Sequence, residues 1–218
     1  MEIPIYSKDY HDYVFKNGRL IGDFDNMYQN SEEVPWHQDI HADSWFNKIG
    51  FLMLKDKAPY KNILEIGCGL GYIAQKLTQL TPDYVDAIDI SLTAIYKARE
   101  IHKNKKINFF VGDITSKDFL LPSTYGLVVI KDVFWYVFDC METVLGNIDQ
   151  CLSSGTYLYI NQSFPSLDTN FVGKEIIDSP ERLIGYFSTR YEPIYKIVVQ
   201  RYESVDDGPL LHYLGVKK

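Results

Sequence analysis

From residue 62 onward, short apolar runs alternate with segments in which apolar residues recur every three or four positions. The short runs predict buried strands, and the three-to-four spacing predicts amphipathic helices. The predicted strands span residues 62–67, 84–89, 107–111, 126–131 and 155–161. The predicted helices span residues 43–54, 71–80, 92–103 and 140–152. This alternation predicts an α/β fold whose parallel strands are joined by right-handed crossovers.

The C-terminal part of the chain departs from this alternation. A helix is predicted over residues 179–191, with Pro180 in its first turn. Two further strands, 194–202 and 210–216, flank the loop Asp206-Asp207-Gly208-Pro209. Strands on either side of a glycine-containing loop predict an antiparallel hairpin. The sheet should therefore have seven strands, mostly parallel, with this hairpin at its end.

The N-terminal part has no long period. Residues 1–42 are polar and rich in aromatic side chains, and we expect them to form a lid over a cleft. The whole chain, 1–218, is predicted to be one domain, with the N-terminal helical lid and a helix in residues 1–58 and the core in residues 59–218.

The most informative stretch is Ile-Leu-Glu-Ile-Gly-Cys-Gly-Leu-Gly, residues 63–71. An apolar strand ends there in Glu65 and is followed by glycines at positions 67, 69 and 71, which allow backbone to approach a ligand closely. A dinucleotide fingerprint needs a third glycine where Tyr72 stands, and no phosphate-loop Lys-Ser or Lys-Thr follows. We therefore expect a nucleotide-like ligand without phosphates.

Two further acidic residues follow predicted strands, at places where they could bind a nucleoside. Asp89 ends the second strand about 20 residues after the glycine turn, where an acid can accept hydrogen bonds from ribose hydroxyls. It could also simply end that strand before Ser91, which can cap the next helix. Asp113 and Ile114 follow the third strand. The acid could accept a hydrogen bond from an exocyclic amine, with Ile114 against a purine, or it could be an ordinary turn residue.

These units in this order resemble the class I S-adenosylmethionine-dependent methyltransferases, which have a Rossmann-like fold. Glu65-Ile66-Gly67-Cys68-Gly69-Leu70-Gly71 is similar to the first motif of that family, and residues 126–136 are similar to its fourth-strand motif. A narrower similarity, to the nodulation-type sugar N-methyltransferases, rests on residues 24–28 and on Val34-Pro35-Trp36, where those enzymes carry Asp-Pro-Trp.

The resemblance implies S-adenosylmethionine as the cofactor. The cofactor-binding residues that it implies are Trp36, Glu65, Gly67, Cys68, Gly69, Gly71, Tyr72, Asp89, Ile90, Asp113, Ile114 and Lys131. The implied activity is methyl transfer to a nitrogen or oxygen of a small molecule. The narrower similarity points to a sugar or nucleotide-linked sugar of a surface glycan.

The residues predicted to act on the acceptor are Asp132, after the fourth strand, and His37 in the lid. Asp132 could hold an amine or take up a proton, or it could be an ordinary loop acid. His41 is a further candidate base. Two alternatives stay open from the sequence: a nicotinamide-dependent oxidoreductase and a non-catalytic module that binds adenosylmethionine.

Composition narrows the partners. A net charge of −7 argues against nucleic acid, whose protein partners are usually basic. No signal peptide or long apolar run is present, and the three cysteines cannot all pair, so we expect a cytoplasmic protein without membrane association. No ligand-spaced cluster predicts a metal. The expected partner is a small-molecule acceptor, with the chain as a monomer or homodimer.

Overall fold

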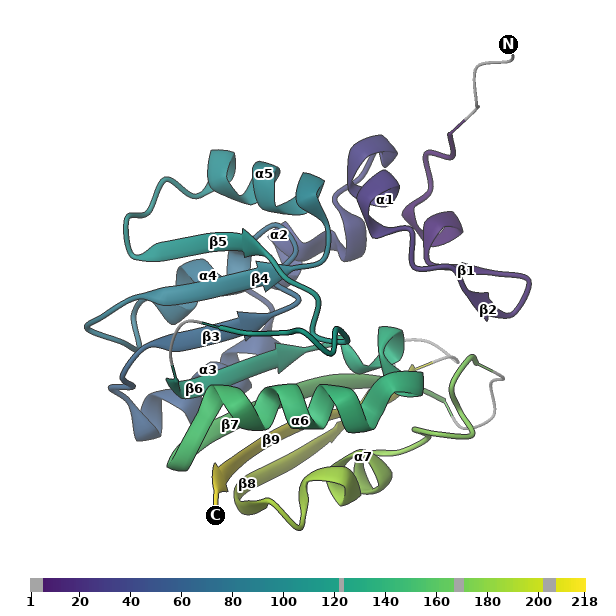
Figure 1. Ribbon diagram of the computed structural model, residues 1–218. Helices are drawn as coiled ribbons and strands as arrows, with labels where there is room; N and C mark the ends of the chain where they lie inside the picture. Colours follow the sequence, from purple (N-terminus) through teal and green to yellow (C-terminus); the bar gives the residue numbers. More distant parts are fainter. Residues whose placement is uncertain (1–5, 122–123, 167–170, 202–206) are drawn as a thin grey trace.

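The computed structural model describes residues 6–121, 124–166, 171–201 and 207–218. Its centre is a seven-stranded sheet in the order β5-β4-β3-β6-β7-β9-β8 (Figure 1). The strands are β3 (Ile63–Ile66), β4 (Val85–Asp89), β5 (Ile107–Val111), β6 (Tyr125–Lys131), β7 (Leu152–Pro165), β8 (Tyr191–Gln200) and β9 (Asp207–Lys217).

The first five strands of the sheet order are parallel, and β9 and β8 join antiparallel. The predicted α/β fold and its C-terminal hairpin are therefore confirmed. The predicted loop begins in residues that are not described, and β9 already includes Asp207 to Pro209. Chain order reverses between β3 and β6, which is where open α/β sheets bind ligands at the carboxyl ends of their strands.

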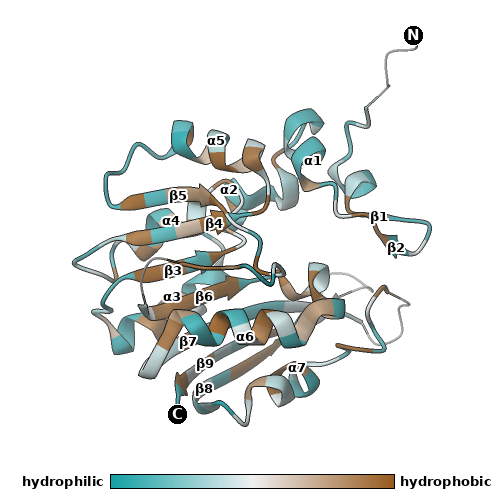
Figure 2. Cartoon of the chain, viewed as in Figure 1, coloured by the Kyte–Doolittle hydropathy of each residue, from teal (hydrophilic) through white to brown (hydrophobic). Residues whose placement is uncertain are grey.

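Helices cover both faces of the sheet, as Figure 1 shows. One face packs against α3 (Trp45–Lys57), α4 (Tyr72–Leu77) and α5 (Leu92–Ile101), and the other against α6 (Met141–Cys151) and α7 (Pro180–Phe187). The parallel strands are apolar along most of their length because both of their faces are buried (Figure 2). Strand β3 is fully buried, which makes Glu65 within it an exception to the apolar pattern.

Residues before α3 form the lid, which contains α1 (Phe24–Asn30), α2 (Gln38–His41) and the short 3-10 helices Tyr10–Tyr13 and Pro35–His37. The lid is only partly helical, because strands β1 (Phe15–Lys16) and β2 (Arg19–Leu20) make a hairpin. Asn17 and Gly18 both have positive φ there, 52° and 71°. The lid has its own apolar cluster, built around Tyr10, Met27 and Tyr28.

Candidate active site

The glycine loop leaves β3 at the point where chain order in the sheet reverses. Gly67, Gly69 and Gly71 have φ of 73°, 51° and 80°, in the left-handed region that favours glycine. The N–H groups of Gly67 and Cys68 both donate to the Ile88 carbonyl, at 2.8 and 2.9 Å. The loop is thus held against the end of β4, which brings it to the predicted ribose acid.

The three glycines meet different neighbours. An added Cβ at Gly69 would lie 2.4 Å from the Gln38 side chain and 2.6 Å from the Tyr28 hydroxyl, both in the lid. At Gly71 the added Cβ would lie 2.6 Å from the Phe109 ring. Gly69 therefore lies directly against the lid, whereas Gly71 allows the loop to pack closely on β5.

Asp89 is joined directly to the glycine loop. Its Oδ2 accepts a hydrogen bond from the Gly69 N–H at 2.8 Å, and its Oδ1 accepts one from the Ser91 N–H at 2.9 Å. Burial raises the pKa of Asp89, and backbone N–H donors including Ile90 act against that rise. Ser91 also caps α5 by accepting from the Ala94 N–H, as the strand-end interpretation of Asp89 expects, and a hydrogen bond from a ribose to Asp89 stays a prediction.

Glu65 is an acidic residue buried within the strand β3. It is 3% exposed, and its Oε2 has no hydrogen-bond partner among the described residues. Burial and the nearby charge of Asp89 raise its pKa to about 8, and the charge of Lys131 and the Ala74 N–H lower it only in part. A buried carboxylate oxygen without a partner is costly, so this position suits a ligand that brings a positively charged donor.

Asp113 and Ile114, the two residues predicted to contact the adenine, already have partners within the protein. Asp113 Oδ1 accepts hydrogen bonds from the N–H and hydroxyl of Thr115, at 2.8 and 2.7 Å. Ile114 is 6% exposed and packs into the core on the α6 side, while its carbonyl accepts from Asn147. The structure thus shows a tight turn here, and a contact of these two residues with a purine stays a prediction.

Three lid residues reach the core, and the sequence did not single out one of them, Gln38. The Leu70 N–H donates to Gln38 Oε1 at 2.8 Å, and Gln38 Nε2 donates to the Tyr28 hydroxyl at 2.8 Å. Asp25 Oδ1 accepts from the Ser91 hydroxyl at 2.9 Å and from the Thr93 N–H at 2.8 Å. Gln38 belongs to no motif, so only the folded chain identifies it.

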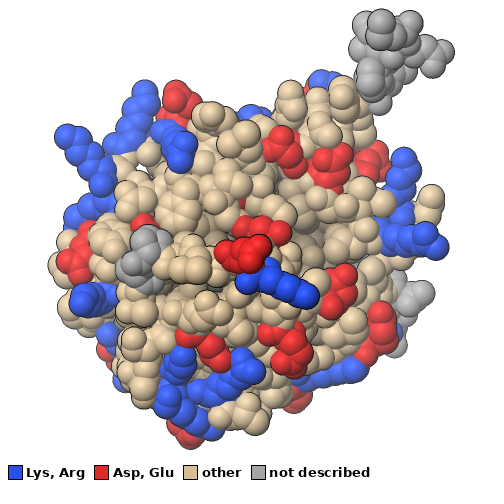
Figure 3. All heavy atoms as spheres, in the orientation of Figure 1, with Lys and Arg blue, Asp and Glu red and all other residues tan. Residues whose placement is uncertain are grey.

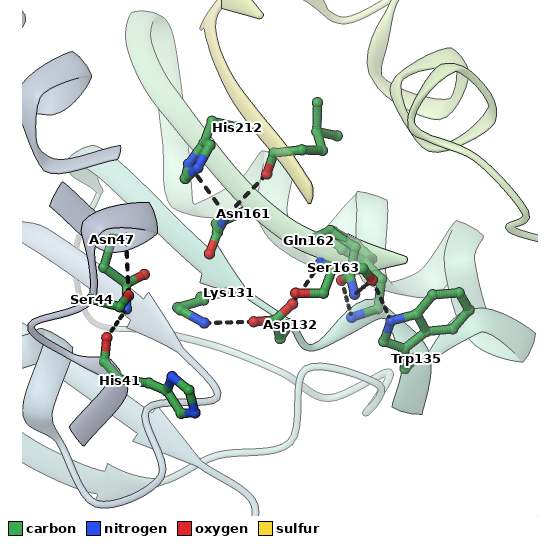
Figure 4. Close-up of polar contacts among 12 residues, drawn as sticks. His41, Ser44, Asn47, Lys131, Asp132, Trp135, Asn161, Gln162, Ser163 and His212 are labelled. Carbon is green, nitrogen blue, oxygen red and sulfur yellow. Dashed lines mark hydrogen bonds and ion pairs between the residues drawn. The ribbon is translucent and has the colours of Figure 1, made fainter. Parts of the chain in front are cut away.

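On the acceptor side, Lys131 and Asp132 stand at the end of β6 (Figure 4). Lys131 Nζ lies 2.5 Å from Asp132 Oδ2, and the Ser163 N–H donates to Asp132 Oδ1 at 2.7 Å. The two side chains are 26% and 32% exposed. Burial favours a higher pKa for Asp132, but Lys131 and the Ser163 N–H outweigh it, so the pKa lies below its ordinary value. The backbone of Asp132 has φ 53°, an uncommon conformation that often marks functional sites.

The aromatic and histidine residues of the lid make no described contact with Asp132 itself. Trp36 packs against Tyr10, with ring centroids 5.7 Å apart, and against Tyr136, also at 5.7 Å. The His37 side chain is 45% exposed and lies 3.8 Å from Glu33. Its described contacts do not include Asp132, so its catalytic role stays a prediction. Trp36 and His37 both have positive φ, 52° and 47°.

The remaining predicted residues lie around the same loop. Cys68 is buried beside Gly69, and burial raises the pKa of its thiol. Tyr72 begins α4, and its ring meets His102 edge-on at 5.0 Å. Ile90 is half exposed after β4. Among the described residues, no group of three His, Cys, Asp or Glu side chains is placed to hold a metal, and no helix could cross a membrane.

The glycine loop, the acid that binds it and the unpartnered Glu65 oxygen fit the ribose and the charged amino-acid end of S-adenosylmethionine. Residues 64–158 match the family profile described as "Methyltransferase domain". Residues 64–158 are thus similar to methyltransferase domains, and the sheet has the order of the Rossmann-like methyltransferase fold.

Particular relatives sharpen the comparison. A malonyl-[acyl-carrier protein] O-methyltransferase of Bacillus anthracis is 31% identical over 114 residues, which is 50% of this chain and 41% of the relative. A second, from Ilyobacter polytropus, is 26% identical over 70% of this chain and 66% of the relative. The chain thus spans about half the length of the curated relatives it matches.

A solved structure shares the fold. The N-methyltransferase NodS of Bradyrhizobium japonicum, in complex with S-adenosyl-L-homocysteine, superposes with a TM-score of 0.69 at 22% sequence identity. The match covers 85% of this chain and 93% of NodS.

Proposed function

We propose that this protein transfers a methyl group from S-adenosylmethionine to a nitrogen or oxygen atom of a small molecule. The observation that carries the proposal is the buried, unpartnered Glu65 oxygen at the base of a glycine loop that Asp89 holds in place. The cofactor supplies the activated methyl group, and the protein supplies position and a shaped, water-poor cavity.

Each residue near the glycine loop has a distinct part in this proposal. Glu65 pairs with the ammonium of the cofactor, Asp89 accepts from its ribose hydroxyls, and Gly69 lets the backbone approach it. Lid residues Gln38 and Tyr28, which lie against Gly69, exclude water from above. Water exclusion strengthens the electrostatic contacts inside the site.

On the acceptor side, Asp132 is better suited to hold a molecule than to deprotonate it. A carboxylate whose pKa lies below its ordinary value is a weak base, but it remains charged and accepts hydrogen bonds throughout the physiological range. A sugar or nucleotide-linked sugar of a surface glycan is our proposed acceptor class. Val34-Pro35-Trp36 supports it, and so does the fold shared with NodS.

The proposal includes both nitrogen and oxygen as the acceptor atom. NodS is an N-methyltransferase, whereas the curated relatives are O-methyltransferases. Transfer to an amine needs only that its lone pair is free, whereas transfer to a hydroxyl gains from a general base. Identification of the product decides between them.

Ligand-induced thermal stabilisation tests the cofactor. We expect S-adenosylmethionine and S-adenosylhomocysteine to raise the melting temperature, and NADH to leave it unchanged. Asp89→Asn should weaken both effects, because the amide can still accept from the Gly69 N–H but loses the charge and one acceptor. Asp118→Asn, an exposed change on a loop, is the matched control.

The outcomes separate the alternatives. No shift with either adenosyl ligand would refute the cofactor assignment, and a shift with NADH alone would favour an oxidoreductase. Tight binding without release of S-adenosylhomocysteine on any amine, sugar or nucleotide-sugar pool would indicate a binding module. Mass spectrometry of a methylated product would identify the acceptor atom.

A further inference from the structure

A row of polar side chains leads from Lys131 into the interior of the protein. Lys131 on β6 is opposite Asn161 on β7, and Asn161 is opposite His212 on β9. Residues directly opposite on neighbouring strands project from the same face of a sheet. Here that face is covered by α3, whose Gly50 comes so close that an added Cβ would lie 1.9 Å from the Tyr159 hydroxyl.

Asn161 and His212 make hydrogen bonds at the interior end of the row, and Figure 4 shows those of Asn161. Asn161 Nδ2 donates to the Leu211 carbonyl at 3.0 Å and lies 3.3 Å from His212 Nδ1. The Tyr159 hydroxyl lies 2.8 Å from the same nitrogen. Because both neighbours can donate, Nδ1 is the acceptor and the imidazole proton is on Nε2.

His212 is neutral in this arrangement. It is fully buried, and burial together with the positive charge of Lys131 lowers its pKa to about 4, against the opposing effect of Asp132. Its Nε2 has no partner among the described residues. Lys131 is therefore the only member of the row that carries a charge near neutral pH.

A small chamber lies between α3 and the row. Its volume is about 30 Å³, room for about one water molecule. Its polar lining residues are Asn47, Lys76, Lys131, Tyr159 and Asn161, and none of the residues that line it is acidic. The Lys131 ammonium pairs with Asp132 at 2.5 Å, and Lys131 also lowers the pKa of Glu65 on the neighbouring strand β3.

We infer that Asn161 and His212 are positioning residues, which fix Lys131 against Asp132 and thereby keep Asp132 as an ionised anchor for the acceptor. The inference rests on the proposed methyl transfer only for its link to the acceptor; the positioning itself is a property of the chain. Asn161 lies opposite Lys131 and His212 lies opposite Asn161, and because both are neutral, neither attracts the Lys131 ammonium away from Asp132.

Four titratable groups around Asp132 bear on its charge. They belong to the elements packed about it: Lys131 on β6, Tyr136 after β6, Tyr159 on β7 and His212 on β9. Burial raises the pKa of both tyrosines above the ordinary value, so their hydroxyl groups are neutral near pH 7. Lys131 is the group that sets the charge of Asp132.

The direct test is the titration of the Asp132 carboxyl carbon by NMR, assigned by its loss in Asp132→Asn. Asn161→Asp places a rival carboxylate opposite Lys131, so the midpoint of Asp132 should rise by about one pH unit or more. Asn104→Asp adds the same charge before β5, at the opposite edge of the sheet, and should leave the midpoint unchanged.

Four further variants keep the inference testable if Asn161→Asp does not fold. Lys131 is partly exposed, and Lys131→Met should raise the Asp132 midpoint while Lys131→Arg should restore it. Tyr159→Phe removes only the hydroxyl bond to His212 and should shift the midpoint less, and Tyr157→Phe on the same strand is its control. Unchanged midpoints in Asn161→Asp and Lys131→Met would overturn the inference.

Kinetics then connect the row to the acceptor. Asn161→Asp should raise the KM for the acceptor at least about tenfold at pH 6, and the KM should recover toward pH 8 as Asp132 ionises again. The Kd for S-adenosylhomocysteine should change less than about threefold. An equal loss of both would place the row in the cofactor site instead. Absence of cofactor binding in the unmodified protein would refute the proposed function while the NMR titration still decides the positioning.

Discussion

Replacing Glu65 by glutamine tests two effects of this buried acid: its effect on the free energy of unfolding and its effect on cofactor binding. In the folded protein its pKa is about 8, against an ordinary value of 4.5. Between these two values the folded state binds more protons than the unfolded state, so the free energy of unfolding falls as pH rises through this window. The shift corresponds to about 5 kcal/mol above pH 8, at 1.36 kcal/mol per pH unit.

Glutamine keeps the shape of the side chain and cannot ionise. We therefore expect Glu65→Gln to flatten the fall in stability between pH 5 and 8 and to be the more stable protein at pH 8.5. Denaturant unfolding at several pH values measures this directly. Glu100→Gln, on the exposed face of α5, is the matched control and should follow the unmodified protein.

The same substitution should weaken cofactor binding, because the neutral amide no longer pairs with an ammonium. In the unmodified protein a bound ammonium lowers the pKa of Glu65, so binding near pH 7 should release protons. Calorimetry in two buffers of different ionisation enthalpy measures that release. If Glu65→Gln alters neither the pH dependence of stability nor the affinity for S-adenosylmethionine, the reasoning about Glu65 is wrong.

Three further changes test the geometry of the site. Gly71→Ala should lower the free energy of unfolding by about 3 kcal/mol, because φ is positive and the Phe109 ring is close. Gly18→Ala should lower it by only about 1 kcal/mol, because φ is positive but the space is open. Denaturant unfolding measures both. Asp25→Ala should cost about 1 kcal/mol and speed hydrogen exchange in the lid, because its hydrogen bonds to α5 are lost; unchanged exchange would contradict its anchoring role. Asp132→Asn should lower turnover more than cofactor affinity in steady-state kinetics and calorimetry, and equal losses would place Asp132 with the cofactor.

The core of this fold could be predicted from sequence because its signals are local. Strands β3, β4 and β6 are short runs buried along nearly all of their length, and their predicted bounds lie within one residue of the structure. Strand β7 is longer than predicted, Leu152–Pro165 against 155–161. The place of Asp89 at the end of its strand follows from the motif and its spacing, whereas its hydrogen bond from the Gly69 N–H is seen only in the structure. Helix α4 ends at Leu77 rather than at residue 80, because Thr78 closes a turn with Gln75.

The lid was less predictable because long-range contacts decide its structure. The hairpin there does have a local signal, the Asn17-Gly18 pair, which favours a tight two-residue turn. Gln38 has no such signal, since its role depends on the Leu70 N–H, 32 residues further along the chain. Gly71 fits the motif, yet its neighbour in the structure is Phe109.

The contact between Gln38 and the Leu70 N–H has a kinetic consequence. The lid also packs against Tyr136, beyond the end of β6, so one segment borders both the glycine loop and the residues near Asp132. A molecule that enters beneath this segment must first displace Gln38 from the loop, and the lid then settles over it. We therefore expect a compulsory order of binding, with S-adenosylmethionine first and the acceptor second. S-adenosylhomocysteine should leave last and act as a competitive inhibitor of the methyl donor.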